Sequence, residues 1–216
     1  MSSEFLVRIP LERVAVLIGP KGSTKKRIEE LTDTKLIIDS QSGDVIIIVE
    51  EEEVEDPISL WKSRDMVKAI GRGFSPQKAL QINNPGFGFE LLQLRDFVGT
   101  SPNALREVRS RLIGKGGRTR NIIEQTAFCY ISVFGNTVGI IAEQRLMQVI
   151  REGIISLING SKQSTVYKYL EDKMRDLKSD KDKLWVTSEK EEDLADITDL
   201  DELERLIFEE EEENQE

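Results

Sequence analysis

Histidine is absent from the 216-residue chain, and cysteine occurs once, as Cys129. The lack of histidine excludes histidine general bases, histidine metal ligands and Ser-His-Asp triads. A single cysteine can form neither an intramolecular disulfide nor a multi-cysteine zinc site, and it is typical of a protein from a reducing compartment. Because Cys129 lies in a predicted strand, we interpret it as a core residue.

Long apolar runs are also absent. The run at residues 45–49 is far shorter than the roughly 20 residues that span a bilayer. The N-terminal sequence Met-Ser-Ser-Glu-Phe has neither the basic start nor the apolar stretch of a signal peptide. We therefore expect a cytoplasmic protein that does not enter a membrane.

The formal charge of −10 is distributed unevenly along the chain. Residues 181–216 hold 16 acidic and 4 basic side chains, whereas residues 1–180 hold 24 acidic and 26 basic ones. Most of the acidity therefore lies in the C-terminal tail, and the overall charge does not exclude a nucleic acid as the partner of the remaining chain.

One short glycine motif, GxxG, occurs twice. It reads Gly-Pro-Lys-Gly at residues 19–22 and Gly-Lys-Gly-Gly at residues 114–117, and each copy follows an apolar turn that ends in Leu-Ile. An offset of 95 residues between Gly19 and Gly114 also aligns other residues of similar type, which indicates an internal duplication. The aligned pairs are Gly22 and Gly117, Lys25 and Arg120, Ile28 and Ile123, Glu29 and Glu124, Leu36 and Ile131, and Ile38 and Val133.

Hydrophobic periodicity predicts the same order of elements in both halves: strand, helix, GxxG loop, helix, two strands and a closing helix. In the first half, the predicted strands are 4–9, 35–39 and 45–50, and the predicted helices are 11–18, 23–31 and 57–72. In the second half, the predicted strands are 89–96, 128–134 and 137–142, and the predicted helices are 102–113, 118–126 and 144–159. A short helix after the Ser75 N-cap, with Pro76 at its first position, and a helix over 164–177 complete the prediction.

This order, with a GxxG loop between the first two helices, resembles the type I KH fold. We predict an α+β protein with two tandem type I KH domains, each a three-stranded antiparallel sheet packed against helices. The expected divisions are a first KH domain at 1–82, a linker at 83–88, a second KH domain with a C-terminal helix at 89–178, and an acidic tail, expected to be flexible, at 179–216.

A KH domain uses its GxxG loop to clamp the backbone of single-stranded nucleic acid. The glycines let phosphates approach the main chain, and the next helix offers unpaired N–H groups and the positive end of its dipole. The second loop is expected to be the stronger clamp, because Pro20 removes an N–H donor from the first. The predicted RNA-binding residues are Gly19, Pro20, Lys21, Gly22, Lys25, Lys26, Arg111, Gly114, Lys115, Gly116, Gly117, Arg118 and Arg120.

Unpaired bases are expected to lie over an apolar groove beside each loop. A groove of this kind accepts bases but excludes a duplex, so the expected ligand is single-stranded. Its predicted walls are Leu17, Ile18, Ile28, Leu36 and Ile38 in the first half and Leu112, Ile113, Ile123, Ile131 and Val133 in the second.

Simpler interpretations stay open for several motifs. Each GxxG can be a tight turn alone, since turns require glycine. The acidic stretch at 50–56 is interpreted as a solvated strand end rather than a two-metal site, and Trp61, Phe74 and Phe87 as core or linker residues rather than base-stacking ones. The Lys-Gly-Ser-Thr sequence at 21–24 has the Lys-Gly order of a Walker loop reversed. We predict no cofactor, no metal and no enzymatic activity.

Three segments beyond the loops resemble one family, the tandem-KH ribosome-assembly factors known as Dim/Pno (partner of Nob), and in particular its archaeal Dim-like members. The segments are residues 64–74 with 79–80, residues 111–119 with 123–124, and residues 157–161 with 166–167, so the resemblance extends over residues 5–177. It implies RNA contacts at Lys115, Gly116, Arg118 and Arg120, beside Arg111. Eukaryotic members tend to have a degenerate first loop; the intact first loop of this chain implies that both modules contact RNA.

The resemblance implies a non-enzymatic factor that binds single-stranded RNA near the 3′ end of small-subunit rRNA or its precursor. The implied partners are the pre-ribosomal small subunit, a Nob-type endonuclease and a Dim-type rRNA adenosine dimethylase. Two alternatives stay open: a KH scaffold that docks proteins, and a KH protein of another RNA-processing or translation complex. In the tail, leucine and isoleucine recur among carboxylates at 194–207, which suits either a partner-binding helix or a solubilising tail.

Overall fold

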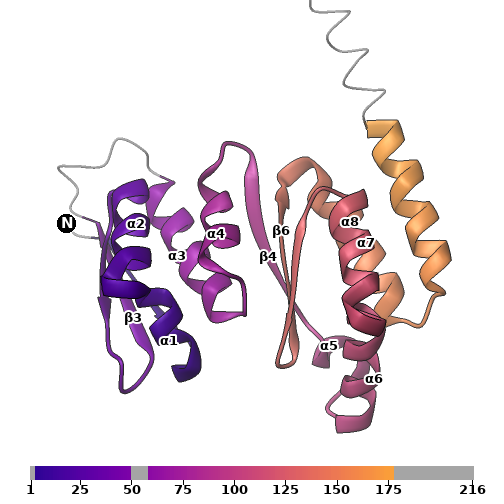
Figure 1. Cartoon of the computed structure of the whole chain (residues 1–216), viewed down its shortest axis with the longest axis horizontal. Coiled ribbons are helices and arrows are strands. Elements are labelled where there is room, and N and C mark those ends of the chain that lie inside the picture. Colours follow the sequence, from indigo (N-terminus) through magenta and orange to yellow (C-terminus); the bar gives the residue numbers. More distant parts are fainter. Residues whose placement is uncertain (1–2, 50–57, 178–216) are drawn as a thin grey trace, which may run out of the picture. The chain divides into compact units, whose positions relative to one another are not determined.

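Each half of the chain forms a three-stranded antiparallel sheet (Figure 1). The computed structural model describes residues 3–49 and 58–177. The first sheet has the order β1-β3-β2, built from β1 (Ser3–Arg8), β3 (Asp44–Val49) and β2 (Lys35–Ile38). The second has the equivalent order β4-β6-β5, built from β4 (Phe87–Gln93), β6 (Thr137–Glu143) and β5 (Tyr130–Phe134). These matching topologies confirm the predicted fold class of two type I KH modules, which we call the first module (residues 3–83) and the second module (residues 87–171).

The helices follow the predicted order. Those of the first module are α1 (Leu11–Ile18), η1 (Pro20–Gly22), α2 (Ser23–Thr32), α3 (Ser59–Gly71), α4 (Pro76–Ala79) and η2 (Leu80–Asn83). Those of the second module are α5 (Arg95–Val98), α6 (Pro102–Ile113), η3 (Lys115–Gly117), α7 (Arg118–Thr126) and α8 (Gln144–Ile158), and residues 163–177 are helical as well. The Ser75 side chain caps α4 as predicted, since its Oγ accepts the Lys78 N–H at 3.4 Å.

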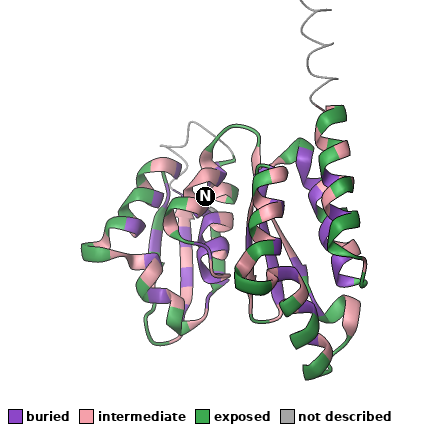
Figure 2. Ribbon diagram, turned by 45° about the vertical axis from the view of Figure 1, so that its right-hand side comes forward, coloured by how far each residue is buried: buried purple, intermediate pink, exposed green. Residues whose placement is uncertain are grey.

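Alternation along the central strand explains why the helices cover one face of the first sheet, whereas residues 137–142 of β6 are all buried, so both faces of the second sheet are covered there. In β3, Val45, Ile47 and Val49 are buried, whereas Ile46 and Ile48 between them are only partly buried. Figure 2 shows a similar division of buried and exposed positions along the helices, which are amphipathic and bury one apolar stripe each. Fully burying one such aliphatic side chain stabilises the fold by about 1.5–3 kcal/mol.

Two strands differ from the prediction by two residues or more at an end. Strand β4 begins at Phe87, so Phe87 and Gly88 of the expected linker belong to the sheet, and it ends at Gln93 rather than at residue 96. The chain then turns into α5, because Leu94 is buried in a helical conformation and its N–H donates to Asn136 O at 2.9 Å. Strand β5 begins at Tyr130 rather than at Phe128, which has a left-handed φ of 49° and a 75% exposed side chain.

The two modules share a buried contact. Phe74, which follows α3 and is 2% exposed, packs edge-to-face on Phe89 of β4 with ring centroids 6.2 Å apart. It also fills the space over Gly139 of β6, where an added Cβ would lie 2.6 Å from Phe74 Cε2. Both modules belong to one compact unit, which ends at Glu171. The interpretation of Phe74 as a core residue is therefore confirmed.

Several predicted features lie outside the described residues. They are the end of the third strand at Glu50, the acidic stretch at 50–56, the start of the helix at Pro57, and the tail at 179–216 with its apolar repeat. Within the described ranges, no helix is both long enough and apolar enough to cross a membrane.

Candidate nucleic-acid interface

The two GxxG loops have nearly the same backbone. The first glycine has φ and ψ of 72° and 173° at Gly19 and of 73° and 174° at Gly114. The last glycine is left-handed in both loops, with a φ of 78° at Gly22 and 79° at Gly117. The duplication that the sequence shows is therefore a duplication of loop geometry.

The first glycine of each loop is required by close packing. An added Cβ would lie 2.3 Å from Thr24 Oγ1 at Gly19 and 2.2 Å from Thr119 Oγ1 at Gly114, and both threonines are buried. The last glycine is required for a different reason: no heavy atom lies within 4 Å of a Cβ at Gly22, but its positive φ is disfavoured for other residues. Each loop thus needs its first glycine because there is no room for a side chain, and its last glycine because of the left-handed backbone.

Each loop ends where a helix begins. Gly22 and Gly117 are the N-cap residues of α2 and α7, and neither helix has a side-chain cap. The first N–H of each helix, at Ser23 and Arg118, already donates to Pro20 O and Lys115 O, so an external acceptor would bind the N–H groups further into the first turn, where the helix dipole adds positive potential. A phosphate group is a suitable acceptor at such a site.

The cations beside the loops fall into two groups. Among the described residues, the side chains of Lys21, Lys26, Lys115 and Arg118 form no hydrogen bond or ion pair and remain open to a ligand. Two others are engaged at a longer distance, because Lys25 Nζ lies 3.8 Å from Glu29 Oε1 and Arg120 Nε lies 3.8 Å from Glu124 Oε2. The structure therefore brings two unpaired cations to each loop.

Two models of KH domains match the chain: a eukaryotic-type KH domain of type I over residues 88–175, and a general KH domain over residues 4–60. A KH domain-containing protein of Methanocaldococcus jannaschii is 37% identical over 180 residues, which cover 83% of this chain and 78% of that protein. Dim2p of Pyrococcus horikoshii OT3 is 46% identical, with a TM-score of 0.73 over 79% of this chain and 99% of its own.

Two further crystal structures are similar. A chain of the a/eIF2α–aDim2p–rRNA complex from P. horikoshii OT3 is 46% identical, with a TM-score of 0.75 over 81% of this chain and 96% of its own. A protein of unknown function from Aeropyrum pernix is 34% identical, with a TM-score of 0.81 over 87% of this chain and 99% of its own. The chain belongs to the Dim/Pno-like tandem-KH family. Its GxxG loops are accordingly the loops of two KH domains in a family of RNA-binding proteins.

The second KH loop opens onto a pocket that the sequence did not predict. The pocket has a volume of about 620 Å³ and is lined by the loop, by α7 and by the helix at 163–177. Gln163 fixes that helix beside the loop, since its Nε2 donates to Thr119 Oγ1 at 2.8 Å. Tyr167 adds an aromatic ring beside Lys115 and Arg118. The sequence predicted the helix, but which of its residues reach the loop depends on long-range packing.

Arg111, a predicted RNA contact, caps another helix of the second KH domain. Its Nη1 donates to Leu157 O and Ile158 O at 3.1 Å each, and its Nη2 pairs with Glu107 Oε1 at 2.6 Å. These bonds satisfy carbonyl groups at the end of α8. Arg111 therefore holds α8 against α6 in this structure, and its contact with RNA stays a prediction.

The predicted groove walls are wrong for six of the ten residues. Leu17, Ile28, Leu36, Leu112, Ile123 and Ile131 are between 0% and 5% exposed, so they form the cores of the KH domains and cannot line an open groove. Ile18, Ile38, Ile113 and Val133 are partly exposed and remain available to a base. The reason is that residues with the clearest helical or strand periodicity face the opposing layer, not the solvent.

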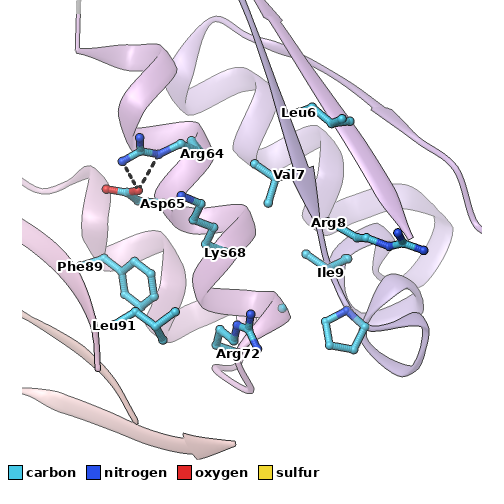
Figure 3. A pocket seen from close by; sticks show the side chains of 12 residues that line it. Leu6, Val7, Arg8, Ile9, Arg64, Asp65, Lys68, Arg72, Phe89 and Leu91 are labelled. Carbon is cyan, nitrogen blue, oxygen red and sulfur yellow. Dashed lines mark hydrogen bonds and ion pairs between the residues drawn. The ribbon is translucent and has the colours of Figure 1, made fainter. Parts of the chain in front are cut away.

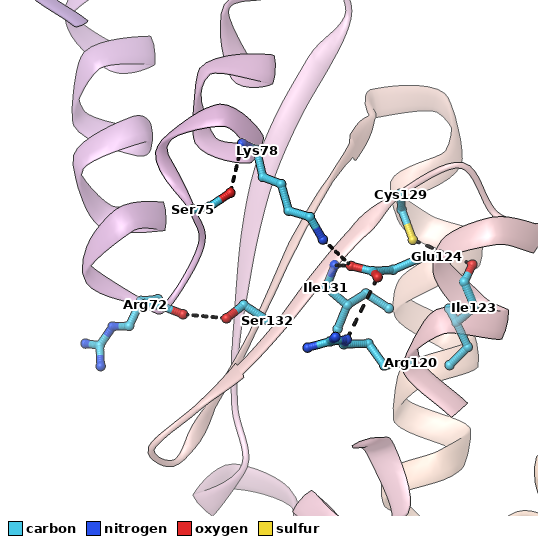
Figure 4. A network of polar contacts seen from close by, with 9 residues as sticks. All are labelled: Arg72, Ser75, Lys78, Arg120, Ile123, Glu124, Cys129, Ile131 and Ser132. Atoms are coloured by element: carbon cyan, nitrogen blue, oxygen red, sulfur yellow. Dashed lines mark hydrogen bonds and ion pairs between the residues drawn. The ribbon is translucent and has the colours of Figure 1, made fainter. Parts of the chain in front are cut away.

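A glutamate braces each KH domain behind its loop. Glu29 Oε1 accepts the Leu36 N–H of β2 at 2.8 Å, and Glu124 Oε1 accepts the Ile131 N–H of β5 at 2.8 Å (Figure 4). Glu124 also pairs with Lys78 of the first domain, with Nζ and Oε1 3.1 Å apart. Burial, followed by the charge of Glu124, raises the pKa of Cys129 to about 12, which agrees with the prediction that this thiol is a core residue.

Proposed function

We propose that this protein is a single-strand RNA-binding factor of small-subunit ribosome assembly that binds near the 3′ end of small-subunit rRNA or its precursor. The observation that carries the proposal is the pair of superposable loops, each followed by an uncapped helix N-terminus and accompanied by two unpaired cations. A crystal structure that contains rRNA together with the homologous aDim2p supports RNA as the ligand.

Within this proposal the second KH domain is the stronger clamp. Its loop carries three glycines and a lysine, and the neighbouring pocket offers room and an aromatic ring for a nucleotide. The first loop offers one N–H fewer because of Pro20. The Nob-type endonuclease and the Dim-type dimethylase are the partners that the family resemblance suggests, and the RNA-bound protein would recruit or regulate them.

The test replaces Lys115 and Gly116 together with aspartate. Aspartate at position 116 meets no steric clash, because no heavy atom lies within 4 Å of an added Cβ, so the strain of its positive φ, about 1 kcal/mol, is the main structural cost. We expect the affinity for a single-stranded oligonucleotide from the 3′ end of small-subunit rRNA to fall by about tenfold or more, because phosphate and two new carboxylates repel each other. Fluorescence anisotropy measures the affinity, and thermal melting measures the structural cost.

The matched variants assign the effect to the loop. Lys35→Asp with Asn103→Asp makes the same change in net charge at exposed positions away from both loops and should alter affinity little. Pro20→Asp with Lys21→Asp tests the first loop and should cause a smaller loss than the change at the second. Unchanged RNA binding by the variant with aspartates at 115 and 116 would refute the role of the second loop.

The second candidate function is a scaffold on which the processing endonuclease docks. It is favoured by the outer face of the first sheet, where Leu6 is 70% exposed, Ile37 is 48% exposed, and Ile46 pairs with both across the sheet. Salt dependence separates the candidates: RNA binding that weakens steeply with added salt supports phosphate contacts, whereas negligible RNA binding beside salt-resistant endonuclease binding supports the scaffold.

A further inference from the structure

A row of cations follows one face of α3 and the turn after it. Arg64, Lys68 and Arg72 are spaced by four residues, which places them one above the other on successive helical turns. Like charges at this spacing destabilise an isolated helix by a few tenths of a kcal/mol per pair. The repulsion within the row is offset in part by the C-terminal end of the helix dipole, and a bound anion would offset it further.

The row forms one side of a pocket, which we call the α3 pocket (Figure 3). Its other sides are residues 6–10, from β1 to the start of α1, and Phe89 and Leu91 of β4. The enclosed volume is about 330 Å³. Four of the lining residues are cationic, namely Arg8, Arg64, Lys68 and Arg72, and Asp65 is the one carboxylate among the described residues that line it.

The single carboxylate, Asp65, already forms an ion pair with Arg64. Asp65 Oδ1 accepts bonds from Arg64 Nη2 at 2.8 Å and from Arg64 Nε at 3.0 Å. By contrast, no hydrogen bond or ion pair within the described residues involves the Lys68 ammonium or the Arg72 guanidinium. Burial, and after it the charge of Arg64, lowers the pKa of Lys68. The pocket thus presents two partly buried cations that form no hydrogen bond or ion pair with the described residues, although the charge of Asp65 partly opposes the lowering of the Lys68 pKa.

The pocket is also fixed in shape. Gly71 forms part of its floor, and an added Cβ there would lie 2.6 Å from Ile9 Cγ2, so α3 and β1 are in direct contact. The Arg72 carbonyl accepts a bond from Ser132 Oγ of the second KH domain at 2.8 Å. Arg64 is held over the ring of Trp61, with Cζ 4.4 Å from the centroid. Such preorganisation lowers the entropy that a ligand loses on binding.

We propose that the α3 pocket binds a phosphate group of the RNA strand and is a third RNA contact of this protein, in addition to the two GxxG loops. The inference rests on the proposed function, because that function supplies the polyanion. Lys68 and Arg72 would bind the phosphate oxygens, and Phe89 and Leu91 would contact the adjoining ribose or base. The pocket residue Pro10 precedes α1, whose 8 residues separate it from the first loop by about 12 Å, a span of only a few nucleotides.

An RNA phosphate fits the pocket better than an acidic peptide does. The two cations Lys68 and Arg72 lie one helical turn apart, and the pocket also contains the apolar side chains of Phe89 and Leu91. One nucleotide, which has a phosphate beside a ribose and a base, matches this arrangement better than a row of carboxylates does. A lysine and an arginine together suit a phosphate. Its oxygens can accept from the compact ammonium group of lysine and, two at a time, from the planar guanidinium group of arginine.

The experiment changes Lys68→Gln and Arg72→Gln together in the full chain. The probe is a fluorescent single-stranded oligonucleotide from the 3′ end of small-subunit rRNA. We expect about tenfold weaker binding, since hydrogen bonds to charged groups are strong, and a shallower dependence of log K on log salt by about 0.7 to 1.4 for the loss of one or two contacts. The melting temperature should stay the same or rise, because repulsion along α3 is removed.

Matched variants and ligands decide the outcome. Neutralising Lys35 and Lys168, which are exposed and lie outside the pocket, removes the same charge and should leave affinity and salt slope unchanged. If that control loses as much, or if the pocket variant loses nothing while the variant with aspartates at 115 and 116 does, the α3 pocket is not an RNA site although the proposed function stands. If neither the loop variant nor the pocket variant weakens binding, the proposed function fails as well.

Protection of Lys68 from an amine-acylating reagent identifies the anion. The RNA oligonucleotide should protect Lys68 at concentrations at which inorganic phosphate and a poly-glutamate peptide do not. Equal protection by free phosphate would show a general anion pocket, and protection by the peptide alone would show a protein-docking site. Either result would overturn the assignment to RNA.

Discussion

The third position of the GxxG loop has a left-handed backbone in both KH domains but holds different residues. Lys21 has a φ of 53° and Gly116 a φ of 62°. A side chain with a Cβ is disfavoured in this region by roughly 1–2 kcal/mol, so the first loop tolerates a strain that the second avoids. The lysine is the third residue of the motif in the first loop, at Lys21, and the second residue in the second loop, at Lys115. The two loops therefore share a backbone conformation but differ in where they present a lysine side chain.

Replacing Lys21 with glycine should remove the backbone strain from the first loop, and replacing Gly116 with lysine should introduce it into the second. We expect Lys21→Gly to raise the free energy of unfolding by about 1 kcal/mol and Gly116→Lys to lower it by a similar amount, because only the left-handed backbone distinguishes the two cases. Urea denaturation followed by circular dichroism measures both changes. A loss of stability in Lys21→Gly would mean that the lysine side chain makes stabilising contacts that outweigh its strain.

At the scale of single elements, α2 and α7 are each bound to the neighbouring sheet by a glutamate side chain. Glu29 and Glu124 occupy equivalent positions and accept the N–H of the second residue of the neighbouring edge strand, at Leu36 and Ile131. The brace ties the helix behind each loop to the sheet. The two glutamates differ in one respect, since only Glu124 pairs with a lysine of the other domain.

This difference can be measured by equivalent substitutions. Glu29→Ala should lower the free energy of unfolding by about 1–2 kcal/mol, because a partly buried N–H loses its acceptor. Glu124→Ala should cost about 1 kcal/mol more, because Lys78 also loses its partner. Urea denaturation of both variants gives the difference, and the Lys78→Met background should abolish it. Equal costs in the original background would show that the ion pair to Lys78 contributes no net stability.

Local sequence predicted most elements but only part of the site. Glycine spacing and periodicity depend on neighbouring residues, and they gave α1, α6 and α7 with the bounds observed. The groove was mispredicted because periodicity identifies the face that is buried, not the rim beside it. Gln163, Tyr167 and the α3 pocket could not be predicted, because their surroundings come from segments far apart in the sequence. The spacing of Arg64, Lys68 and Arg72 was visible, but the strands that enclose them were not.

At the scale of the whole molecule, the two KH domains are joined by more than a connecting segment. Phe74 lies between them, and its neighbours Arg72 and Lys78 bind Ser132 and Glu124 of the second domain. The described residues of both domains accordingly belong to one compact unit. The two GxxG loops on such a unit keep a set relation to each other, so under the proposed function an RNA strand that binds both loops would also meet the α3 pocket.

The shared core predicts that the two KH domains unfold together. Trp61 reports on the first domain once Trp185 is replaced by phenylalanine, and Cys129, which is 3% exposed and has its pKa raised to about 12, reports on the second through its reaction with a thiol reagent. In urea, Trp61 fluorescence and brief pulses of thiol labelling should give the same midpoint. Phe74→Ala should lower the free energy of unfolding by about 3–5 kcal/mol, because it leaves a cavity at the contact, and it should separate the two midpoints. Separate midpoints before this substitution would mean that each domain is stable by itself and that Phe74 packs without coupling them.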